Sequence, residues 1–209
     1  MPTETQKPAS KRDRILAAAA QVIGERGLDA FVVKDITALA GVTPQLTYYH
    51  FPNRQALVRG VFQYAAERAP SVNLLHLDRE ASGYEALRGA LHAEFDDSPE
   101  VRDLNLIWNE VTALPIEDPE LAEAVRRATE RWNEQVTIGI LRGLADGSIV
   151  TAAAPQAVAE LLTALVEGLS QRWLAGLISP DDARRTLDVV LSTIRRARSG
   201  RDQAAQSLP

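Results

Sequence analysis

Residues 14–57 read RILAAAAQVIGERGLDAFVVKDITALAGVTPQLTYYHFPNRQAL, and this stretch decides the fold. Apolar residues recur at three- and four-residue spacing before Gly27 and again around Ala40-Gly41-Val42, which predicts three short helices in succession. A helix, a glycine-containing turn and a second helix with polar and aromatic side chains are typical of a helix-turn-helix DNA reader. We therefore predict a DNA reader near the N-terminus.

The composition is that of a globular protein, because 45% of the 209 residues are hydrophobic and 24% are charged. No apolar run approaches the ~18 residues that a membrane span needs, and the opening MPTETQKPASKR is too polar for a secretory signal. Cysteine is absent, which excludes disulfides and thiolate metal sites and is compatible with a reducing compartment. These observations predict a cytoplasmic protein without a membrane partner.

The formal charge of −5 is unevenly distributed along the chain. Residues 1–60 hold eight Lys and Arg against five acidic residues, whereas residues 61–209 hold fifteen against twenty-three. DNA affinity depends on the local positive patch rather than on the total charge. The basic end coincides with the predicted DNA reader and supports it.

Proline after an N-cap side chain marks several helix starts, as at Ser98-Pro99, Asp118-Pro119 and Ser179-Pro180. Strand signals are nearly absent, since apolar and polar residues rarely alternate. We predict an all-α fold with an N-terminal three-helix helix-turn-helix domain and a C-terminal six-helix bundle. The expected helices are 11–26, 33–40, 44–50, 53–68, 82–96, 99–112, 119–146, 155–177 and 180–198.

The two ends of the chain have the polar composition of unstructured termini. Between them we expect a DNA-binding part and a larger part for ligand binding and dimerisation. The expected boundaries are a flexible basic arm at 1–10, a helix-turn-helix domain at 11–52, a helical ligand-binding and dimerisation domain at 53–199, and a flexible tail at 200–209.

The predicted recognition helix is only about two turns long, so packing must hold it. We expect Tyr48 and Phe51 to anchor it and the remaining side chains to face outward. Gln45 can bond an adenine edge and Leu46 can contact a thymine methyl group, whereas Tyr49 suits phosphate oxygens. The alternative is a three-helix packing unit whose tyrosines are core residues. The predicted DNA-binding residues are Lys34, Thr43, Pro44, Gln45, Leu46, Tyr49, His50 and Arg54.

The run AGVTPQLTYYHFPNRQAL, within residues 40–57, resembles the signature of the TetR family of transcriptional regulators. In that signature A-G-V-S/T precedes Y-x-H-F and a basic residue that opens the next helix. The resemblance covers about residues 12–58. It implies a dimeric one-component regulator with an N-terminal DNA-binding part and a C-terminal ligand-sensing part. A ligand entering between 53–68 and 155–177 would then shift helix 53–68 and release the DNA.

Three positions depart from the family pattern. Val32 replaces the usual Thr or Ser cap of the second helix, and Asp35 is expected to compensate by accepting from the cap's amide. Thr47 replaces a Leu or Ile that would anchor the recognition helix. Leu46 is bulkier than the small residue often found at its position, which alters the expected sequence preference.

The C-terminal two-thirds carries one apolar stripe per expected helix, as a bundle around a ligand cavity would. Three tryptophans lie near acids in sequence, and an aromatic and acidic cavity would suit an organic cation. The segments IWNEVTALPIEDPELAEAV and ALVEGLSQRW also resemble the C-terminal part of choline-responsive TetR-type repressors. Core tryptophans are the alternative. The predicted ligand-binding residues are Phe62, Leu91, Phe95, Leu104, Trp108, Trp132, Val136 and Glu167; the acid–aromatic pairs are Trp108 with Glu110, Trp132 with Glu134 and Trp173 with Glu167.

The expected helix 155–177 is apolar over much of its circumference, so it must bury two faces. Together with helix 180–198 and their copies in a second subunit it would form a four-helix interface. The alternative is that both helices are buried within one monomer. The predicted dimer residues are Val158, Leu162, Leu165, Leu169, Trp173, Leu187, Val190, Leu191 and Ile194.

Enzyme and adaptor alternatives have little support in the sequence. His50, His76 and His92 are in no metal-binding spacing, and no nucleophile or phosphate-binding motif is present. An all-helical enzyme, or a helical adaptor with a degenerate DNA reader, remains the alternative. We predict a ligand-responsive, DNA-binding regulator without cofactor or metal, in which a small molecule releases a homodimeric repressor from a palindromic duplex operator.

Overall fold

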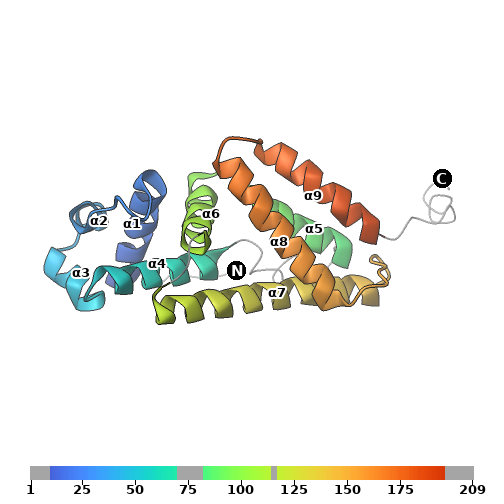
Figure 1. Ribbon diagram of the computed structural model, residues 1–209, viewed down its shortest axis with the longest axis horizontal. Helices are drawn as coiled ribbons and strands as arrows, with labels where there is room; N and C mark the ends of the chain where they lie inside the picture. The colour runs from blue at the N-terminus through green and yellow to red at the C-terminus, as the bar shows by residue number, and fades with distance from the viewer. Residues whose placement is uncertain (1–9, 70–81, 114–116, 196–209) are drawn as a thin grey trace, which may run out of the picture. The chain divides into compact units, whose positions relative to one another are not determined.

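The computed structural model describes residues 10–69, 82–113 and 117–195, and these contain nine α-helices and one isolated bridge between Ile149 and Arg195 (Figure 1). The predicted all-α fold is confirmed, and the first three helices have the expected bounds. The helices are α1 (Lys11–Arg26), α2 (Val33–Ala40), α3 (Pro44–His50), α4 (Arg54–Arg68), α5 (Gly83–Ala93), α6 (Pro99–Thr112), α7 (Pro119–Ala145), α8 (Pro155–Leu174) and α9 (Pro180–Ile194).

Helices α5 and α8 end three residues sooner than the sequence predicts, whereas α6 ends at Thr112 as predicted. Helix α5 ends at Ala93 rather than at residue 96. Helix α8 ends at Leu174 rather than at residue 177, because the chain turns at Gly176, whose φ of +72° favours glycine. Helix α9 ends at Ile194, because the backbone of Arg195 is extended. The rest of the predicted extension, residues 196–198, lies beyond the described residues.

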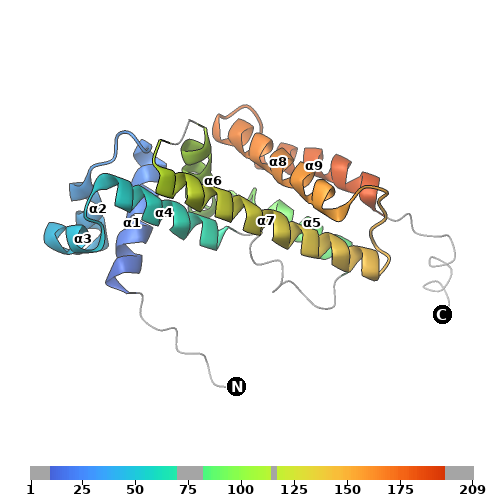
Figure 2. The same cartoon turned by 60° about the horizontal axis from the view of Figure 1, so that its bottom comes forward.

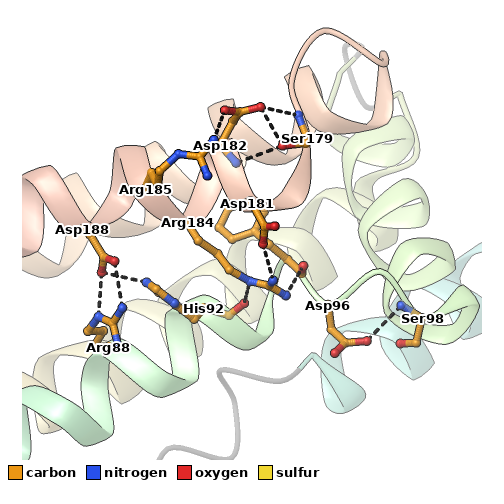
Figure 3. Close-up of polar contacts among 11 residues, drawn as sticks. Arg88, His92, Asp96, Ser98, Ser179, Asp181, Asp182, Arg184, Arg185 and Asp188 are labelled. Carbon is orange, nitrogen blue, oxygen red and sulfur yellow. Dashed lines mark hydrogen bonds and ion pairs between the residues drawn. The ribbon is translucent and has the colours of Figure 1, made fainter.

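The predicted N-caps work in different ways. Ser179 forms a capping box with Asp182, in which each side chain accepts from the other residue's backbone amide. Asp118 accepts from the amides of Glu120 and Leu121. Ser98 provides no side-chain cap for α6; instead Asp96 accepts from the Ser98 amide at 2.9 Å (Figure 3).

The described residues pack into two compact units, each with most of its contacts within itself. The first contains 10–69, 96–113 and 117–130, and therefore α1–α4, α6 and the start of α7. The second contains 82–95 and 131–195, and therefore α5, the rest of α7, α8 and α9. The predicted division at residues 52 and 53 is thus not a packing boundary and stays a prediction about function. The predicted arm and tail lie outside the described residues, apart from Ser10, which caps α1.

In the first unit, α4 and α6 share one core with the helix-turn-helix. Its fully buried members include Ile15, Ile23, Ile36 and Leu57, and α6 adds Ile107. A neighbouring cluster joins Phe62 of α4 to residues of α6 and α7. Burial at these positions follows the predicted three- and four-residue spacing, with one exception: Leu39 of α2 is half exposed.

In the second unit, α8 and α9 lie side by side in both ribbon views (Figures 1 and 2). Charged groups tie α5 to α9 (Figure 3). Arg88 donates two hydrogen bonds to Asp188, at 2.7 and 2.8 Å, and His92 lies 2.8 Å from the same carboxylate. Arg184 donates to the carbonyl oxygens of His92 and Phe95. The Arg88 guanidinium holds the pKa of Asp188 below its usual range.

Helix α6 approaches α1 closely at Gly24, where a β-carbon would overlap the Asp103 carboxylate. Asp103 is half-buried. Its burial raises its pKa from the usual 3.8 to about 6, and the negative charge of Glu25 contributes in the same direction. The close packing of α1 and α6 therefore includes a carboxylate that loses solvation when the chain folds.

We expect Asp103→Asn to stabilise the protein at pH 7. Because the pKa of Asp103 is raised to about 6 in the folded state, the unfolded chain ionises first as pH rises from about 4, and the carboxylate then lowers the free energy of unfolding. Asparagine has nearly the same shape and no charge. In urea denaturation the variant should have a larger free energy of unfolding than the wild type at pH 7. The difference between the two free energies should shrink towards pH 4. An equal difference at both pH values would contradict this account.

Candidate DNA-binding site

The turn between α2 and α3 fixes the start of the recognition helix. Gly41 adopts a left-handed conformation with φ of +62°, and the amide of Val42 donates to the carbonyl oxygen of Thr37 at 3.1 Å. Thr43 then caps α3 by accepting from the Leu46 amide at 3.3 Å, and Pro44 occupies the first turn. Thr43 is therefore the side-chain N-cap of the recognition helix.

The end of α3 is held by burial of Phe51, which follows its last residue and is 4% exposed. A β-carbon on Gly60 of α4 would lie 2.7 Å from the Phe51 ring and 3.2 Å from Leu16 of α1. A glycine is therefore required at position 60 for the ring to pack between the two helices. The predicted anchoring role of Phe51 agrees with this packing.

The other predicted anchor is wrong, because Tyr48 is 52% exposed and Thr47 is 1% exposed. Neighbouring residues of a helix point about 100° apart. Because Thr47 and not Tyr48 is buried, the side of α3 that faces outward is rotated by about that angle from the predicted one. Tyr48 thus joins the exposed side chains. The buried Thr47 hydroxyl has no hydrogen-bond partner among the described residues, a cost that the usual leucine would avoid.

The outward side of α3 faces a surface hollow of about 510 Å³. Tyr49 is 80% exposed, Pro44 and Gln45 are exposed, and Leu46 and His50 are half-buried. Lys11 and Arg14 of α1 bring positive charge to the hollow, and Arg14 also donates to the Ala40 carbonyl oxygen at 2.6 Å. The sequence analysis missed these two basic residues, although their three-residue spacing indicated a shared helix face. The hollow is lined by Lys11, Arg14, Gly41, Val42, Thr43, Gln45, Leu46 and Tyr49.

Four of the predicted DNA-binding residues do not line this hollow: Pro44 and His50 of α3, Lys34 of α2 and Arg54 of α4. Lys34 is exposed on the first turn of α2. Arg54 opens α4, but its guanidinium donates to the carbonyl oxygens of Leu28, Asp29 and Phe31 and lies 3.9 Å from the Phe31 ring centroid. Its partners within the chain are therefore backbone carbonyl oxygens of the loop before α2.

The start of α2 also differs from expectation. Val32 provides no side-chain cap, as predicted, but Asp35 does not supply the replacement. Its carboxylate forms an ion pair with Arg26 at the end of α1. The first turn of α2 is therefore held by its neighbours in the fold and not by its own cap.

The predicted ligand-binding residues fall in both packing units. In the first unit, Phe62 and Trp108 stack with ring centroids 5.4 Å apart, and Leu104 belongs to the core. Glu110 accepts from the Leu28 amide at 2.5 Å, so it is not dedicated to the predicted pair with Trp108. In the second unit, Phe95 packs edge-to-face on Trp173 at 6.2 Å. Leu91, Trp132 and Val136 are buried there, and Glu167 is half-buried.

Most of the predicted dimer residues are core residues of their own subunit. On α8 and α9 only Leu165 and Val190 of the predicted set are half-buried rather than buried. The exposed apolar side chains are instead Leu161, 59% exposed, and Val189, 67% exposed. Helix α8 carries two apolar stripes, and most of the residues predicted for the interface lie on the inward one; the predicted interface stays a prediction. The buried residues of the predicted set are Val158, Leu162, Leu169, Trp173, Leu187, Leu191 and Ile194.

Two family models match the chain. The model described as bacterial regulatory proteins of the tetR family matches residues 15–61, and the model described as the C-terminal part of BetI-type transcriptional repressors matches residues 83–196. A curated relative, the HTH-type transcriptional repressor KstR2 of Mycolicibacterium smegmatis, is 30% identical over 148 residues, which are 70% of this chain and 71% of the relative. The regulator TtgR of Pseudomonas putida is 24% identical over 88% of this chain and 91% of its own.

Solved structures share the fold. A TetR-family regulator from Rhodococcus sp. superposes with a TM-score of 0.78 at 35% identity, covering 89% of this chain and 98% of its own. A transcriptional regulator from Saccharomonospora viridis, solved in complex with choline, gives a TM-score of 0.78 at 23% identity, with the same coverage of both chains. At that lower identity the likeness shows the fold alone.

The exposed recognition helix, its capped turn and the shared core define a helix-turn-helix DNA-binding protein. The matches to both parts of the chain are more specific: the chain belongs to the TetR family of transcriptional regulators. It is a ligand-responsive, DNA-binding regulator of a family whose members bind operators as homodimers and respond to small-molecule effectors. The enzyme alternative is not favoured, because the family is one of transcription regulators.

Two searches of the described residues bear on other kinds of site. No group of three or more histidine, aspartate or glutamate side chains in the described ranges is placed to hold a metal ion. Within the same ranges, no helix combines the length and the apolar character that a bilayer crossing requires.

We expect Arg54→Ala to lower the free energy of unfolding by about 1–2 kcal/mol, because it removes a charged donor from three carbonyl oxygens. The salt dependence of binding to non-specific duplex should stay unchanged, whereas loss of a phosphate contact would reduce the slope by about one. Arg54→Lys serves as the control, since it keeps the charge without the planar fork. Arg54 would instead contact phosphate if Arg54→Lys binds duplex normally while Arg54→Ala binds weakly and with a smaller salt dependence.

Proposed function

We propose that α3 and the adjoining hollow form the operator-reading surface of a homodimeric repressor that a small organic effector releases from DNA. The observation that carries this proposal is the exposure of Gln45 and Tyr49 next to Lys11 and Arg14. Side chains that can bond to base edges therefore lie beside positive groups that can bind phosphate. Because the proposed target is genomic DNA, we place its action in the cytoplasm.

The residues divide by chemistry. Gln45 offers an amide for bidentate bonding to adenine, and Leu46 offers an apolar surface for a thymine methyl group. Thr43, Tyr48 and Tyr49 suit phosphate oxygens. The predicted contacts of Pro44, Lys34 and His50 fit their outward or partly outward positions. Arg54 leaves the proposed set because its donors already have partners within the chain.

We place the subunit interface on the outward stripe of α8 and α9. Exposed Leu161 and Val189 are supported by half-buried Leu165 and Val190. Exposed Gly168 has open space around its α-carbon, so a partner helix can approach closely there. A two-fold axis would bring the same stripe from both subunits together. Two α3 helices about 34 Å apart would then match half-sites one DNA turn apart.

We place the effector in the interior of the second unit. Between α7 and α8, Thr163 donates to the Asn133 side chain at 2.6 Å. Thr137 of α7 is buried, and its hydroxyl donates to the backbone carbonyl oxygen of Asn133 at 2.8 Å. Buried hydroxyl groups among apolar side chains suit a ligand with a polar group on a largely apolar body. Choline, which the S. viridis relative binds, is the first compound to titrate, with tryptophan fluorescence as the signal.

We expect Gln45→Ala to relax sequence preference at one base pair of each half-site by about 1–3 kcal/mol. The duplex used is the one that the wild-type protein enriches from a randomised pool, and affinity is measured for all four bases at each position. Gln21→Ala is the control, because Gln21 is an exposed glutamine of α1 that bonds Glu25 at 3.2 Å. An unchanged base preference in the Gln45 variant would refute the assignment.

We expect Leu161→Glu to convert the dimer into monomers. The substitution places two unpaired carboxylates in a two-fold interface, and each costs about 3–5 kcal/mol when it is buried without a partner. Leu141→Glu on α7 is the control, since Leu141 is an equally apolar residue that is 48% exposed. Light scattering after size exclusion measures the mass. Loss of the dimer in both variants, or in neither, would argue against this interface.

A further inference from the structure

The loop between α1 and α2, residues 27–32, is held by groups from two other helices. Glu110 of α6 accepts from the Leu28 amide at 2.5 Å, while Arg54 of α4 donates to the carbonyl oxygen of the same residue. Phe31 is buried and stacks against the Arg54 guanidinium. Both polar atoms of the Leu28 backbone therefore have partners outside the loop.

The space for Glu110 depends on the backbone at the end of α1. Gly27 has a φ of +83°, and its amide closes α1 by donating to the Ile23 carbonyl oxygen at 2.7 Å. A β-carbon at position 27 would lie 3.1 Å from Oε1 of Glu110. The carboxylate thus occupies the space that the glycine leaves, with Oε2 on the next amide.

The loop matters for DNA binding because α2 has no side-chain cap of its own. The backbone at Val32 starts α2 unaided, and the Asp35–Arg26 ion pair involves exposed side chains, so it contributes little. Helix α2 passes directly into the Gly41 turn and α3. The position of the loop therefore bears on the position of the recognition helix.

We propose that Glu110 is a positioning residue for operator binding: by holding the Leu28 amide, it places the α1–α2 loop and with it the helix-turn-helix on the body formed by α4 and α6. Removing the acceptor of a partly buried backbone amide leaves that amide unpaired, which costs free energy whether the acceptor is a carboxylate or an amide oxygen. If α6 moves away, the half-buried Leu28 amide loses its acceptor, and the loop relaxes with α2. This assignment concerns DNA binding itself and does not depend on where the effector binds.

The test separates the reach of the side chain from its charge. Glu110→Gln keeps an oxygen at the same distance without the charge, and Glu110→Asp keeps the charge on a side chain one methylene shorter. Glu110→Ala removes both. Glu100→Gln is the matched control, since Glu100 is an exposed carboxylate in the first turn of the same helix. Thermal unfolding followed by circular dichroism sets the temperature at which every variant is folded.

The measurement is fluorescence anisotropy at one salt concentration on three duplexes. These are the duplex enriched by the wild-type protein, the same duplex with one base pair inserted between its half-sites, and an unrelated duplex. Glu110→Asp and Glu110→Ala should bind the enriched duplex roughly three- to thirtyfold more weakly and discriminate less against the insertion. Their affinity for the unrelated duplex should change by less than about twofold, because the basic surface is intact.

Glu110→Gln and Glu100→Gln should both remain within about twofold of the wild type on every duplex. Hydrogen exchange should show a faster Leu28 amide in Glu110→Asp than in Glu110→Gln. The proposal is overturned if Glu110→Asp binds and discriminates as the wild type does, or if Glu110→Gln binds as weakly as Glu110→Asp. It is also overturned if the affinities of Glu110→Asp for the enriched duplex and for the unrelated duplex fall by the same factor. Should the alanine variant not fold, the aspartate and glutamine pair decides the question.

Discussion

The recognition helix α3 has seven residues, too few to persist alone in water, so its position is set by what lies directly beyond it. Phe51 packs between α1 and α4 in space left by Gly60, and Thr43 and Gly41 fix the other end. The side chains of α3 are consequently displayed by a helix whose two ends are both attached to longer ones. Without the burial of Phe51, neither the exposed tyrosines nor Gln45 would have a defined direction.

The same dependence on neighbours extends to α2. Its start has no side-chain cap, so its position is set by the burial of Ile36 against α1 and by the loop at residues 27–32. That loop is bonded by Arg54 from α4 and by Glu110 from α6. The three helices of the DNA reader therefore cannot be treated as an independent domain: their core includes Ile107 of α6 and Leu57 of α4. A displacement of either supporting helix changes the contacts of the reader directly.

Much of this fold could be predicted because its determinants are local. Caps, prolines and apolar periodicity lie within a few residues of the helix ends they specify, and α1, α2 and α3 have the predicted bounds. The exposed side of α3 was harder to predict from the sequence. Tyr48 and Thr47 are neighbours on a two-turn helix, and burying either of them gives the helix a plausible apolar side. The contacts of Arg54 within the chain could not be predicted, for a different reason. Its partners at residues 28–31 are distant in sequence, and no local pattern indicates which carbonyl oxygens lack donors.

For the subunit interface proposed above, the sequence predicts two apolar stripes on α8 but not which of them faces outward. Helix α8 is apolar nearly all round, so periodicity alone cannot tell its inward face from its outward one. Side-chain size does distinguish them: the inward stripe carries Trp173 and Leu169, whereas the outward one mixes Leu161 with Ala164 and Gly168. Large side chains fill the interior of a single subunit at high density, while small ones let a second helix approach. Residue volume along each stripe, added to periodicity, would therefore have assigned the two faces correctly before any coordinates were known.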